Sequence, residues 1–345
     1  MFQNFKYSFL VTIVCIALAV WWGVSSPMGW LTAVFLMLVL SIMEISLSFD
    51  NAVVNASILK DMDEKWQQRF LTVGILIAVV GMRLIFPIAI VAIATGLGTM
   101  DVMNMALQQP QDYARHLNES HTAIASFGGM FLLLVFLSFM FDSDKEVHWL
   151  EIFEEKMRAL GKLEVISILI ALITLFAMQS LLPVDDTERL TILVAGLAGI
   201  VLYIAVSSLD VFFESDKQGD AAVNTVKRSG AMAFLYLEVL DASFSFDGVI
   251  GAFAITSDIV IIMLGLAVGA MFVRSLTIDL VHKGTLDEYI YLEHGAHYGI
   301  GALAIIMLLS IHFHISEIIT GLIGISFISF ALYSSIRYRR LHSNQ

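Results

Sequence analysis

The chain has 345 residues, of which 58% are hydrophobic and 14% are charged, and its mean hydropathy is +0.84. This composition excludes an ordinary soluble domain and is typical of a membrane protein with several spans. The formal net charge is −12, no basic run indicates nucleic-acid binding, and the single cysteine, Cys15, excludes a disulfide framework or a thiolate metal site within one chain. We therefore expect a lipid bilayer, and no nucleic acid, as a partner.

Apolar runs follow one another along the whole chain. About 20 apolar residues are needed to cross the roughly 30 Å of bilayer hydrocarbon. Runs of suitable length lie near residues 9–24, 30–58, 70–95, 121–141, 163–182, 190–213, 231–256, 258–280, 295–312 and 315–336. The sequence therefore predicts an all-α polytopic membrane protein with about ten transmembrane helices.

Basic residues are distributed very unevenly between the two sides that these runs define. Fifteen fall on the side that holds both termini, Arg115 and Arg189 fall on the other side, and Arg83 and Arg274 fall inside the runs. Lysine and arginine concentrate in the cytoplasmic loops of membrane proteins. We therefore expect both termini in the cytoplasm and the chain in the inner membrane of a bacterium.

An acidic motif in the second run returns in the seventh. Residues 44–51 read Glu-Ile-Ser-Leu-Ser-Phe-Asp-Asn and residues 241–248 read Asp-Ala-Ser-Phe-Ser-Phe-Asp-Gly, at a constant offset of 197. Each copy is followed, one run later, by a lone arginine and then by a run that opens with a histidine and glycines. Because the two copies are an odd number of runs apart, they cross the membrane in opposite directions. This predicts a 5+5 inverted-topology repeat with halves at 1–189 and 190–345.

The two motifs offer only oxygen donors, from carboxylate, hydroxyl and amide groups. Such donors suit hard or borderline divalent cations, namely Mn²⁺, Mg²⁺ or Ca²⁺. We therefore predict a divalent-cation site where the two halves meet. Its candidate ligands are Glu44, Ser46, Ser48, Asp50, Asn51, Asp241, Ser243, Ser245 and Asp247.

Helical geometry places the acids of one motif on different faces. On a continuous helix Glu44, Ser48 and Asn51 share a face, whereas Asp50 points about 120° away. An interruption at Phe-Asp-Asn or Phe-Asp-Gly would let both carboxylates converge and would free backbone carbonyls as ligands. Discontinuous helices at the midplane do this in transporters, and we expect one here.

The charges of the motifs also bear on function. Four motif carboxylates with Arg83 and Arg274 give a formal charge of −2, which one divalent cation would neutralise. Unpaired charge at the bilayer centre costs at least roughly 2.5–3.5 kcal/mol per residue. We therefore expect the empty site to take up protons or Na⁺, as in a cation antiporter that works by alternating access. Glu238 adds a charge if it faces the same cavity, and the arginines are either gating counter-charges or structural ion pairs.

The motif at 44–51, the arginine that follows it, and Phe127-Gly128-Gly129-Met130-Phe131-Leu132 resemble the TerC family of integral membrane proteins, within the superfamily of LysE-like exporters. The chain is most similar to the longer TerC-like branch, in which the acidic motif is duplicated. The resemblance covers more than half of the chain. It implies export of a divalent metal, chiefly Mn²⁺, with the family's acidic positions at Glu44, Asp50, Asp241 and Asp247. Asp241 and Gly248 differ from Glu44 and Asn51 of the first copy, so the two half-sites need not be equivalent.

Other functions stay open at this point. An exporter of a small organic solute, such as an amino acid, would use the acids to bind an amine. A non-transporting membrane subunit would load metal onto secreted proteins or stabilise an envelope complex, and a homo-oligomer is also open. The motif serines have a simpler interpretation as donors to their own helices. No nucleophile–base pair or phosphate-binding loop is visible, so we do not expect an enzyme.

The segments outside the runs carry weaker signals. Residues 101–120 and 214–229 are expected to be polar loops. Residues 148–162 predict an amphipathic helix in the cytoplasmic interface, with Glu151, Glu154 and Glu155 on its solvated face. For His294, His297, His312 and His314, which lie near run ends, a structural or surface role is favoured over metal binding or a proton relay, and Gly265 with Gly269 indicates a close helix contact.

Overall fold

A computed structural model describes residues 5–142, 145, 147–161, 165–214, 230–313 and 315–342. Within this part of the chain there are helices and no strand. In chain order they are α1 (Lys6–Ser25), α2 (Trp30–Leu47), α3 (Phe49–Leu59), α4 (Glu64–Leu76), the π-helix η1 (Ile77–Ile85), α5 (Phe86–Thr95), α6 (Thr99–Gln108), α7 (Pro110–Glu119), α8 (His121–Phe141), α9 (Glu151–Leu160), α10 (Ile166–Leu181), α11 (Asp186–Glu214), α12 (Gly230–Ile255), α13 (Ile259–His282), α14 (Thr285–Glu288), α15 (Leu292–Ser310) and α16 (Glu317–His342).

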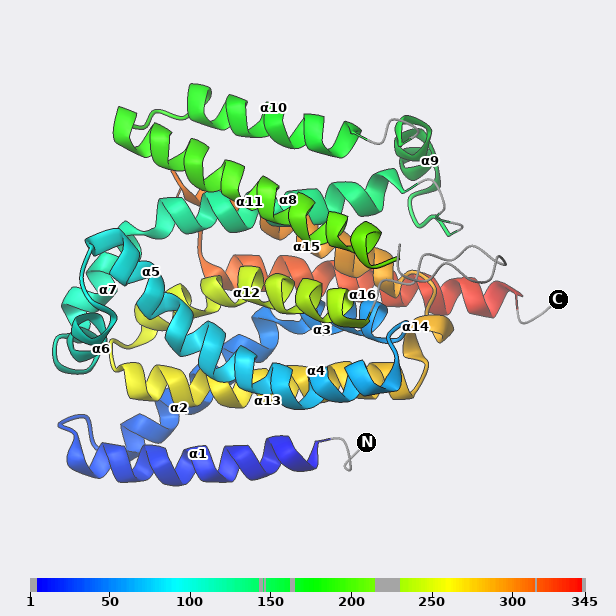
Figure 1. Ribbon diagram of the computed structural model, residues 1–345. Helices are drawn as coiled ribbons and strands as arrows, with labels where there is room; N and C mark the ends of the chain where they lie inside the picture. The colour runs from blue at the N-terminus through cyan, green and yellow to red at the C-terminus, as the bar shows by residue number, and fades with distance from the viewer. Residues whose placement is uncertain are drawn as a thin grey trace.

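Most of the long helices form a bundle along roughly one direction, to which α2, α5 and α11 are inclined (Figure 1). Among the described residues, seven helices are long and apolar enough to cross a membrane, and there are eight if the bent combination of α4, η1 and α5 crosses as one span. α10, with 16 residues, and α12, which carries three carboxylates, are not among them. An all-α membrane protein with several spans is thus confirmed, whereas the number ten and the inverted repeat stay predictions.

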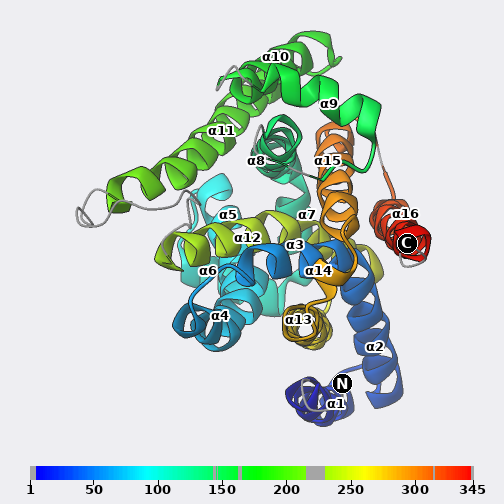
Figure 2. The same cartoon turned by 90° about the vertical axis from the view of Figure 1, so that its right-hand side faces the viewer.

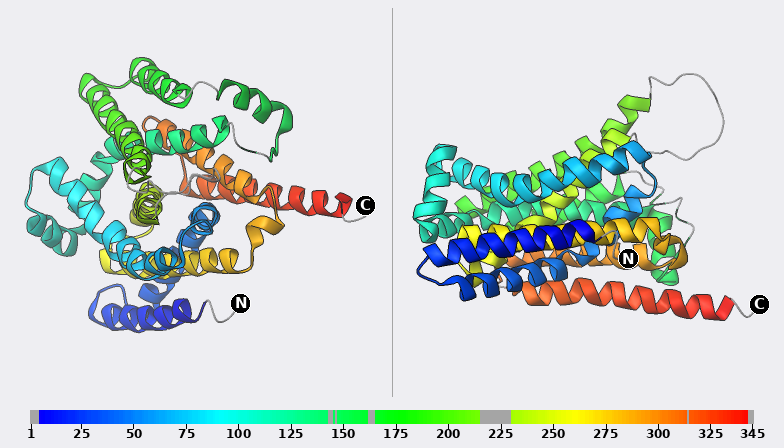
Figure 3. Two further views of the ribbon diagram at one scale, coloured as in Figure 1. Left: turned by 45° about the vertical axis from the view of Figure 1, so that its right-hand side comes forward. Right: turned by 90° about the horizontal axis from the view of Figure 1, so that it is seen from below.

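The two ends of the bundle hold different elements. The start of α1, the end of α16, α9 and α14 lie at one end, and α6 and α7 lie at the other (Figures 1 and 3). Viewed along the helices, α3 and α12 lie in the centre, between α4 and α13 on one side and α8 and α15 on the other (Figure 2). The second motif and residues 49–51 of the first therefore belong to central helices, whereas residues 44–47 form the end of α2. The polar loop expected at 101–120 is wrong, because α6 and α7 occupy most of it; the loop expected at 214–229 lies almost entirely outside the described residues.

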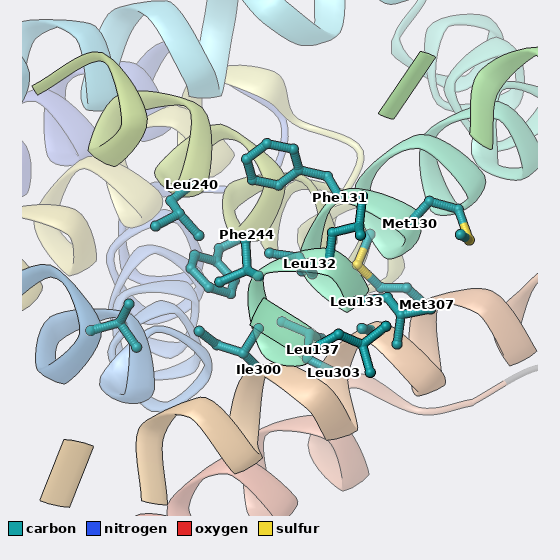
Figure 4. Packing of buried hydrophobic residues seen from close by; sticks show 14 of the residues in the cluster. Met130, Phe131, Leu132, Leu133, Leu137, Leu240, Phe244, Ile300, Leu303 and Met307 are labelled. Atoms are coloured by element: carbon teal, nitrogen blue, oxygen red, sulfur yellow. The ribbon is translucent and has the colours of Figure 1, made fainter. Parts of the chain in front are cut away.

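The two halves of the sequence share their hydrophobic cores. One core combines α3, α8, α10 and α11 with α12 and α15, as Figure 4 shows for Leu132 of α8, Phe244 of α12 and Leu303 of α15. The other core combines α1 and α2 with α12 and α13. The predicted boundary between 189 and 190 falls in the first turn of α11. The division into halves stays a prediction about sequence, because the cores do not follow it.

Glycines bring α2 and α13 into close contact. A Cβ on Gly265 would lie 2.9 Å from the Met37 carbonyl oxygen, and one on Gly269 would lie 3.1 Å from the Ser41 carbonyl oxygen. The Ser41 hydroxyl donates to the Gly265 carbonyl at 3.0 Å. The contact predicted from these two glycines is confirmed, and small residues at i and i+4 are the usual means by which membrane helices approach closely.

The two motifs differ in backbone conformation. α2 ends at Leu47 and α3 begins at Phe49, with Ser48 between them at φ −102° and ψ 17°. The predicted interruption is therefore confirmed in the first copy, one residue before Phe49. In the second copy it is wrong, because α12 continues from Gly230 to Ile255 through the whole motif.

Candidate functional site

Glu44 and Arg83 form a buried ion pair near the end of α2. Glu44 is 1% exposed and Arg83 is 5% exposed, and Arg83 Nη2 donates to Glu44 Oε1. Arg83 Nη1 donates to the Ala78 carbonyl at 2.6 Å, and the Ser48 hydroxyl donates to Glu44 Oε1 at 3.1 Å. A buried charge that is both paired and hydrogen-bonded is compensated for its loss of water. The first motif acid is thus held in a fixed position by η1 and by the residue at the helix break.

The second motif approaches the first at this carboxylate. A Cβ on Gly248 would lie 2.6 Å from Glu44 Oε2, and one on Gly269 would lie 2.5 Å from Glu44 Cγ. Either side chain would displace Glu44 from its pair with Arg83. The contact agrees with the expectation that the two copies meet. It also gives a physical reason for glycine at 248, where the first copy has Asn51.

Asp50 faces another part of the molecule, towards α15 and α16. It is 5% exposed, and a Cβ on Gly299 or Gly324 would lie 3.3 or 3.2 Å from Asp50 Oδ2. With Thr320 among its neighbours, Asp50 lines a cavity of about 20 Å³. A cavity needs roughly 10–15 Å³ by this measure to hold one water molecule. The space beside Asp50 therefore suits a single water molecule or a small ion.

Two asparagines follow Asp50 on α3 with unsatisfied oxygens. Asn51 and Asn55 are each 3% exposed, and the side-chain oxygen of each has no hydrogen-bond partner among the described residues. They lie one turn apart and so share a face of the helix. Buried carbonyl oxygens normally find a partner, so this face has acceptors to offer. Asn55 is absent from the sequence prediction, although a second amide in an apolar run is a visible signal.

Glu238 and Arg274 form the second buried pair, between α12 and α13. Arg274 Nη2 lies 3.5 Å from Glu238 Oε1, while Nη1 donates to the Phe70 carbonyl at 2.6 Å and the guanidinium carbon lies 3.8 Å from the centroid of the Phe70 ring. Neither carboxylate oxygen of Glu238 has a hydrogen-bond partner among the described residues. Asp241, one turn further along α12, interacts electrostatically with both members of the pair. The partner of Arg274 in this salt bridge thus lies outside the motif.

The remaining predicted ligands are spread over several surroundings. The Ser46 hydroxyl donates to the Ile42 carbonyl at 2.8 Å and lines an apolar groove of about 420 Å³ between α2, α12 and α16. The Ser243 hydroxyl donates to the Val239 carbonyl at 3.0 Å, and Ser245 is buried. Ser46 and Ser243 therefore bond to their own helices. Asp247 lies in α12, but its side chain is outside the described residues.

The described side chains do not assemble a complete metal site. Among them, no three histidine, cysteine, aspartate or glutamate residues gather closely enough to hold a metal ion. Glu44 contacts η1, α12 and α13, whereas Asp50 contacts α15 and α16. The metal-ligand assignments, including that of Asp247, stay predictions.

A buried polar cluster lies at the end of the bundle that holds α9. Glu154 is fully buried, Lys145 Nζ lies 2.9 Å from Glu154 Oε2, and the Tyr298 hydroxyl donates to Glu154 Oε1 at 3.1 Å. His294 Nε2 lies 3.4 Å from Oε2. Burial raises the pKa of Glu154, but hydrogen bonds from His294, the Leu150 N–H and Lys145 outweigh it, so the pKa lies below its ordinary value of 4.5.

This cluster corrects the interpretation of residues 148–162. The solvated position predicted for Glu154 is wrong, whereas Glu151 and Glu155 are exposed as predicted. His294 and His297 are buried, and His297 stacks on Phe139 with 3.8 Å between ring centroids. Their role in packing agrees with the structural interpretation. α9 is thereby fixed to α15, the helix that brings Gly299 to Asp50.

Comparison with known proteins adds one finding to this geometry. A family model described as "Protein of unknown function (DUF475)" matches residues 49–342. The chain belongs to this family. The match includes Asp50 and the whole second motif but begins after Glu44, and it names neither the TerC family nor the LysE-like superfamily, so that resemblance stays a prediction from the motif. No curated protein and no solved structure matches the chain.

Proposed function

We propose that this protein is a transporter that exports a divalent metal cation, with Mn²⁺ as the first candidate. The observation that carries the proposal is Asp50, a buried carboxylate just after a helix break. It lines a cavity of about 20 Å³ together with two glycines, a threonine and three apolar side chains. Interrupted helices with acidic residues at membrane depth are typical of ion sites in transporters. The size of the cavity favours an ion over the organic solute of the alternative function.

The buried charges support a cationic substrate. Arg83 is paired with Glu44 and Arg274 with Glu238, and Asp50 has no arginine partner among the described side chains. The four motif acids and Glu238 make five carboxylates, namely Glu44, Asp50, Glu238, Asp241 and Asp247, and with the two arginines they give a formal charge of −3. A divalent cation reduces this to −1, and protons or Na⁺ would balance the empty state. Coupling to protons or Na⁺ by alternating access is therefore part of the proposal.

The choice of Mn²⁺ and the direction of transport have separate supports. Oxygen donors alone fit Mn²⁺, Mg²⁺ and Ca²⁺ equally, and the preference for Mn²⁺ and for export comes from the resemblance to TerC proteins. The excess of basic residues at the end that holds the start of α1 and the end of α16 supports a cytoplasmic position for that end. A location in the inner membrane of a bacterium, with both termini in the cytoplasm, is part of the proposal.

Metal flux into proteoliposomes tests the proposal. The purified chain should carry Mn²⁺ in a manner that depends on a pH or Na⁺ gradient, and Asp50→Asn should abolish the flux because it removes the charge that lines the cavity. Ser46→Ala is the matched control, since Ser46 lies in the same motif but its hydroxyl donates to a carbonyl of its own helix.

Two results would contradict the proposal. The wild-type chain could show no flux of Mn²⁺, Mg²⁺ or Ca²⁺ and could retain a partner protein through purification. That result would favour the non-transporting subunit. Calorimetry that shows unchanged micromolar Mn²⁺ affinity in a chain carrying both Asp50→Asn and Asp247→Asn would favour the organic-solute exporter.

A further inference from the structure

Two cavities adjoin one another along α15. The cavity of about 20 Å³ beside Asp50 is lined by Leu47, Thr320 and Leu303, and a second cavity of about 40 Å³ is again lined by Leu47 and Thr320. The second cavity also contacts Met307, Ser310 and His121. Leu47 and Thr320 therefore form the boundary between the two spaces.

The second cavity extends towards the end of the bundle opposite the start of α1. Leu303, Met307 and Ser310 follow the i, i+4, i+7 pattern of one helical face, which covers about 10 Å at 1.5 Å per residue. Ser310 is the last residue of α15 and His121 is the first residue of α8, and these ends lie on the side of α6 and α7 (Figure 1). Figure 4 shows Leu303 and Met307 side by side on α15. The two cavities thus lead from Asp50 towards the end of the bundle that holds α6 and α7. This end is the outer one according to the distribution of basic residues.

Polar side chains are present in both cavities, among apolar ones. Asp50 and the Thr320 hydroxyl lie at the inner cavity, and the Ser310 hydroxyl lies 3.3 Å from His121 Nε2 at the outer one. Each cavity exceeds the roughly 10–15 Å³ that one water molecule needs. Both can therefore hold a water molecule or a small ion, while Leu47 contributes an apolar side chain between them.

Leu47 lies directly at the helix break of the first motif. It is the last residue of α2, and Ser48, the next residue, leaves the helical conformation before α3 begins. Its Cδ2 would lie 3.1 Å from a Cβ on Gly321, so Leu47 packs directly on α16 where that helix has no side chain. Leu47 also borders the apolar groove of about 420 Å³ and so separates three spaces. An apolar side chain at a constriction blocks ions by excluding water.

We propose that these cavities are the outer half of the ion pathway, with Leu47 as its gate and with Thr320, Ser310 and His121 as its polar lining. The inference rests on the proposed function, because it assigns the route by which the cation at Asp50 reaches the outside. Thr320 then contacts the cation as it passes Leu47, and rotation at the break after Leu47 opens the route. The groove on the far side of Leu47 is apolar and does not conduct ions.

Cysteine accessibility tests the route without any transport measurement. Cys15→Ser makes a cysteine-free chain. Single cysteines on α15 are then introduced by Ser310→Cys in the outer cavity and by Leu303→Cys in the Asp50 cavity. Ile305→Cys serves as the reporter on the outer surface of the bundle, because Ile305 is 51% exposed. A charged, membrane-impermeant thiol reagent is added to the outer side of oriented vesicles. Ser310→Cys should react readily, Leu303→Cys slowly, and Ile305→Cys not at all.

Substitutions at Leu47 should change the labelling rate of Leu303→Cys but not that of Ser310→Cys. Leu47→Ala should speed the reaction of Leu303→Cys about tenfold, which corresponds to ~1.4 kcal/mol in favour of the open gate, and should leave Ser310→Cys unchanged. Leu47→Val should give a smaller increase and serves if the alanine variant does not fold. Labelling of Leu303→Cys only from the inner side, or a rate that is the same with leucine, valine and alanine at 47, would overturn the proposal.

Protection by metal separates this inference from the proposed function. If Mn²⁺ slows the labelling of Leu303→Cys and loses this effect in Asp50→Asn, the route leads to the proposed metal site. If the gate responds to Leu47 but Mn²⁺, Mg²⁺ and Ca²⁺ give no protection, the proposed substrate is wrong and the route holds.

Discussion

The two copies of the acidic motif share a sequence but differ in structure. The first copy contains a helix break at Ser48, and its arginine lies in a π-helix and pairs with the motif acid Glu44. The second copy lies in the unbroken helix α12, and its arginine lies in the regular helix α13 and pairs with Glu238, one turn before Asp241. The position that corresponds to Glu238 in the first half is Ser41, which bonds to the Gly265 carbonyl. A sequence repeat has therefore kept its acids while exchanging the partners of its arginines.

This difference indicates a division of roles between the halves. The helix break, the π-helix and the unsatisfied amide oxygens of Asn51 and Asn55 belong to the first half, whereas the cavity at Asp50 is lined by residues of both halves. Helix breaks and π-helical turns are frequent at functional sites. The second half supplies regular helices that surround these features, including Gly248, Gly299 and Gly324 at the acids. We therefore expect substitutions in the first copy to have the larger effects.

The largest expected effect is the loss of charge at Glu44. Glu44→Gln should lower the free energy of unfolding by roughly 3–5 kcal/mol, because it leaves the buried charge of Arg83 without a carboxylate. Glu238→Gln should cost less, since Arg274 keeps the Phe70 carbonyl, the Phe70 ring and the nearby Asp241. Denaturant titration in detergent micelles measures both values. Equal losses in the two variants would remove the difference between the half-sites.

The histidines that open α8 and α15 extend the comparison to the ends of the bundle. His121 contacts Ser310, whereas His294 contacts the buried Glu154 together with Lys145. Glu154→Gln should lower the free energy of unfolding by roughly 1.5–3 kcal/mol at pH 7, the range for hydrogen bonds to charged groups. Glu151→Gln is the control, because Glu151 is exposed on the same helix.

The same glutamate predicts a pH dependence. Its pKa in the folded chain is lower than its ordinary value of 4.5, so the folded state releases the proton more readily than the unfolded state does. Its contribution is then complete above about pH 4.5 and is lost as the pH falls below that value. The difference in melting temperature between wild type and Glu154→Gln should shrink between pH 6 and pH 3. A constant difference would contradict this assignment.

Sequence reasoning predicted the features that depend on local pattern. Long apolar runs identified the spanning helices, and the spacing of Gly265 and Gly269 identified the contact between α2 and α13. It failed where the partner comes from a distant helix. The sequence put Glu238 close to the second motif but did not show which acid Arg274 contacts, because an apolar helix gives no periodicity to identify the face towards α13. Burial of Glu154 depends on Tyr298, which is 144 residues away in the chain.

Exchanging the residue that differs between the motif copies should have an intermediate effect. Gly248→Asn makes the second motif end as the first does, but its Cβ would lie 2.6 Å from Glu44 Oε2. Overpacking of this kind costs roughly 1–3 kcal/mol. Gly81→Ala is the matched control, because its Cβ would lie 3.5 Å from Ile77 Cγ2, an ordinary contact. A stable Gly248→Asn chain would show that the copies do not meet at Glu44.

The smallest expected effect concerns the serine at the helix break. Ser48→Ala removes the hydroxyl that donates to Glu44 Oε1 at 3.1 Å and should cost roughly 0.5–1.5 kcal/mol. Ser46→Ala should change stability by less than about 0.5 kcal/mol, because its hydroxyl bonds only to its own helix at a partly exposed position. Melting temperatures of the two variants, measured side by side in one detergent, give the comparison. If Ser46→Ala costs as much as Ser48→Ala, the hydroxyl at the break does not fix Glu44. The ion pair with Arg83 alone would then define the first half-site.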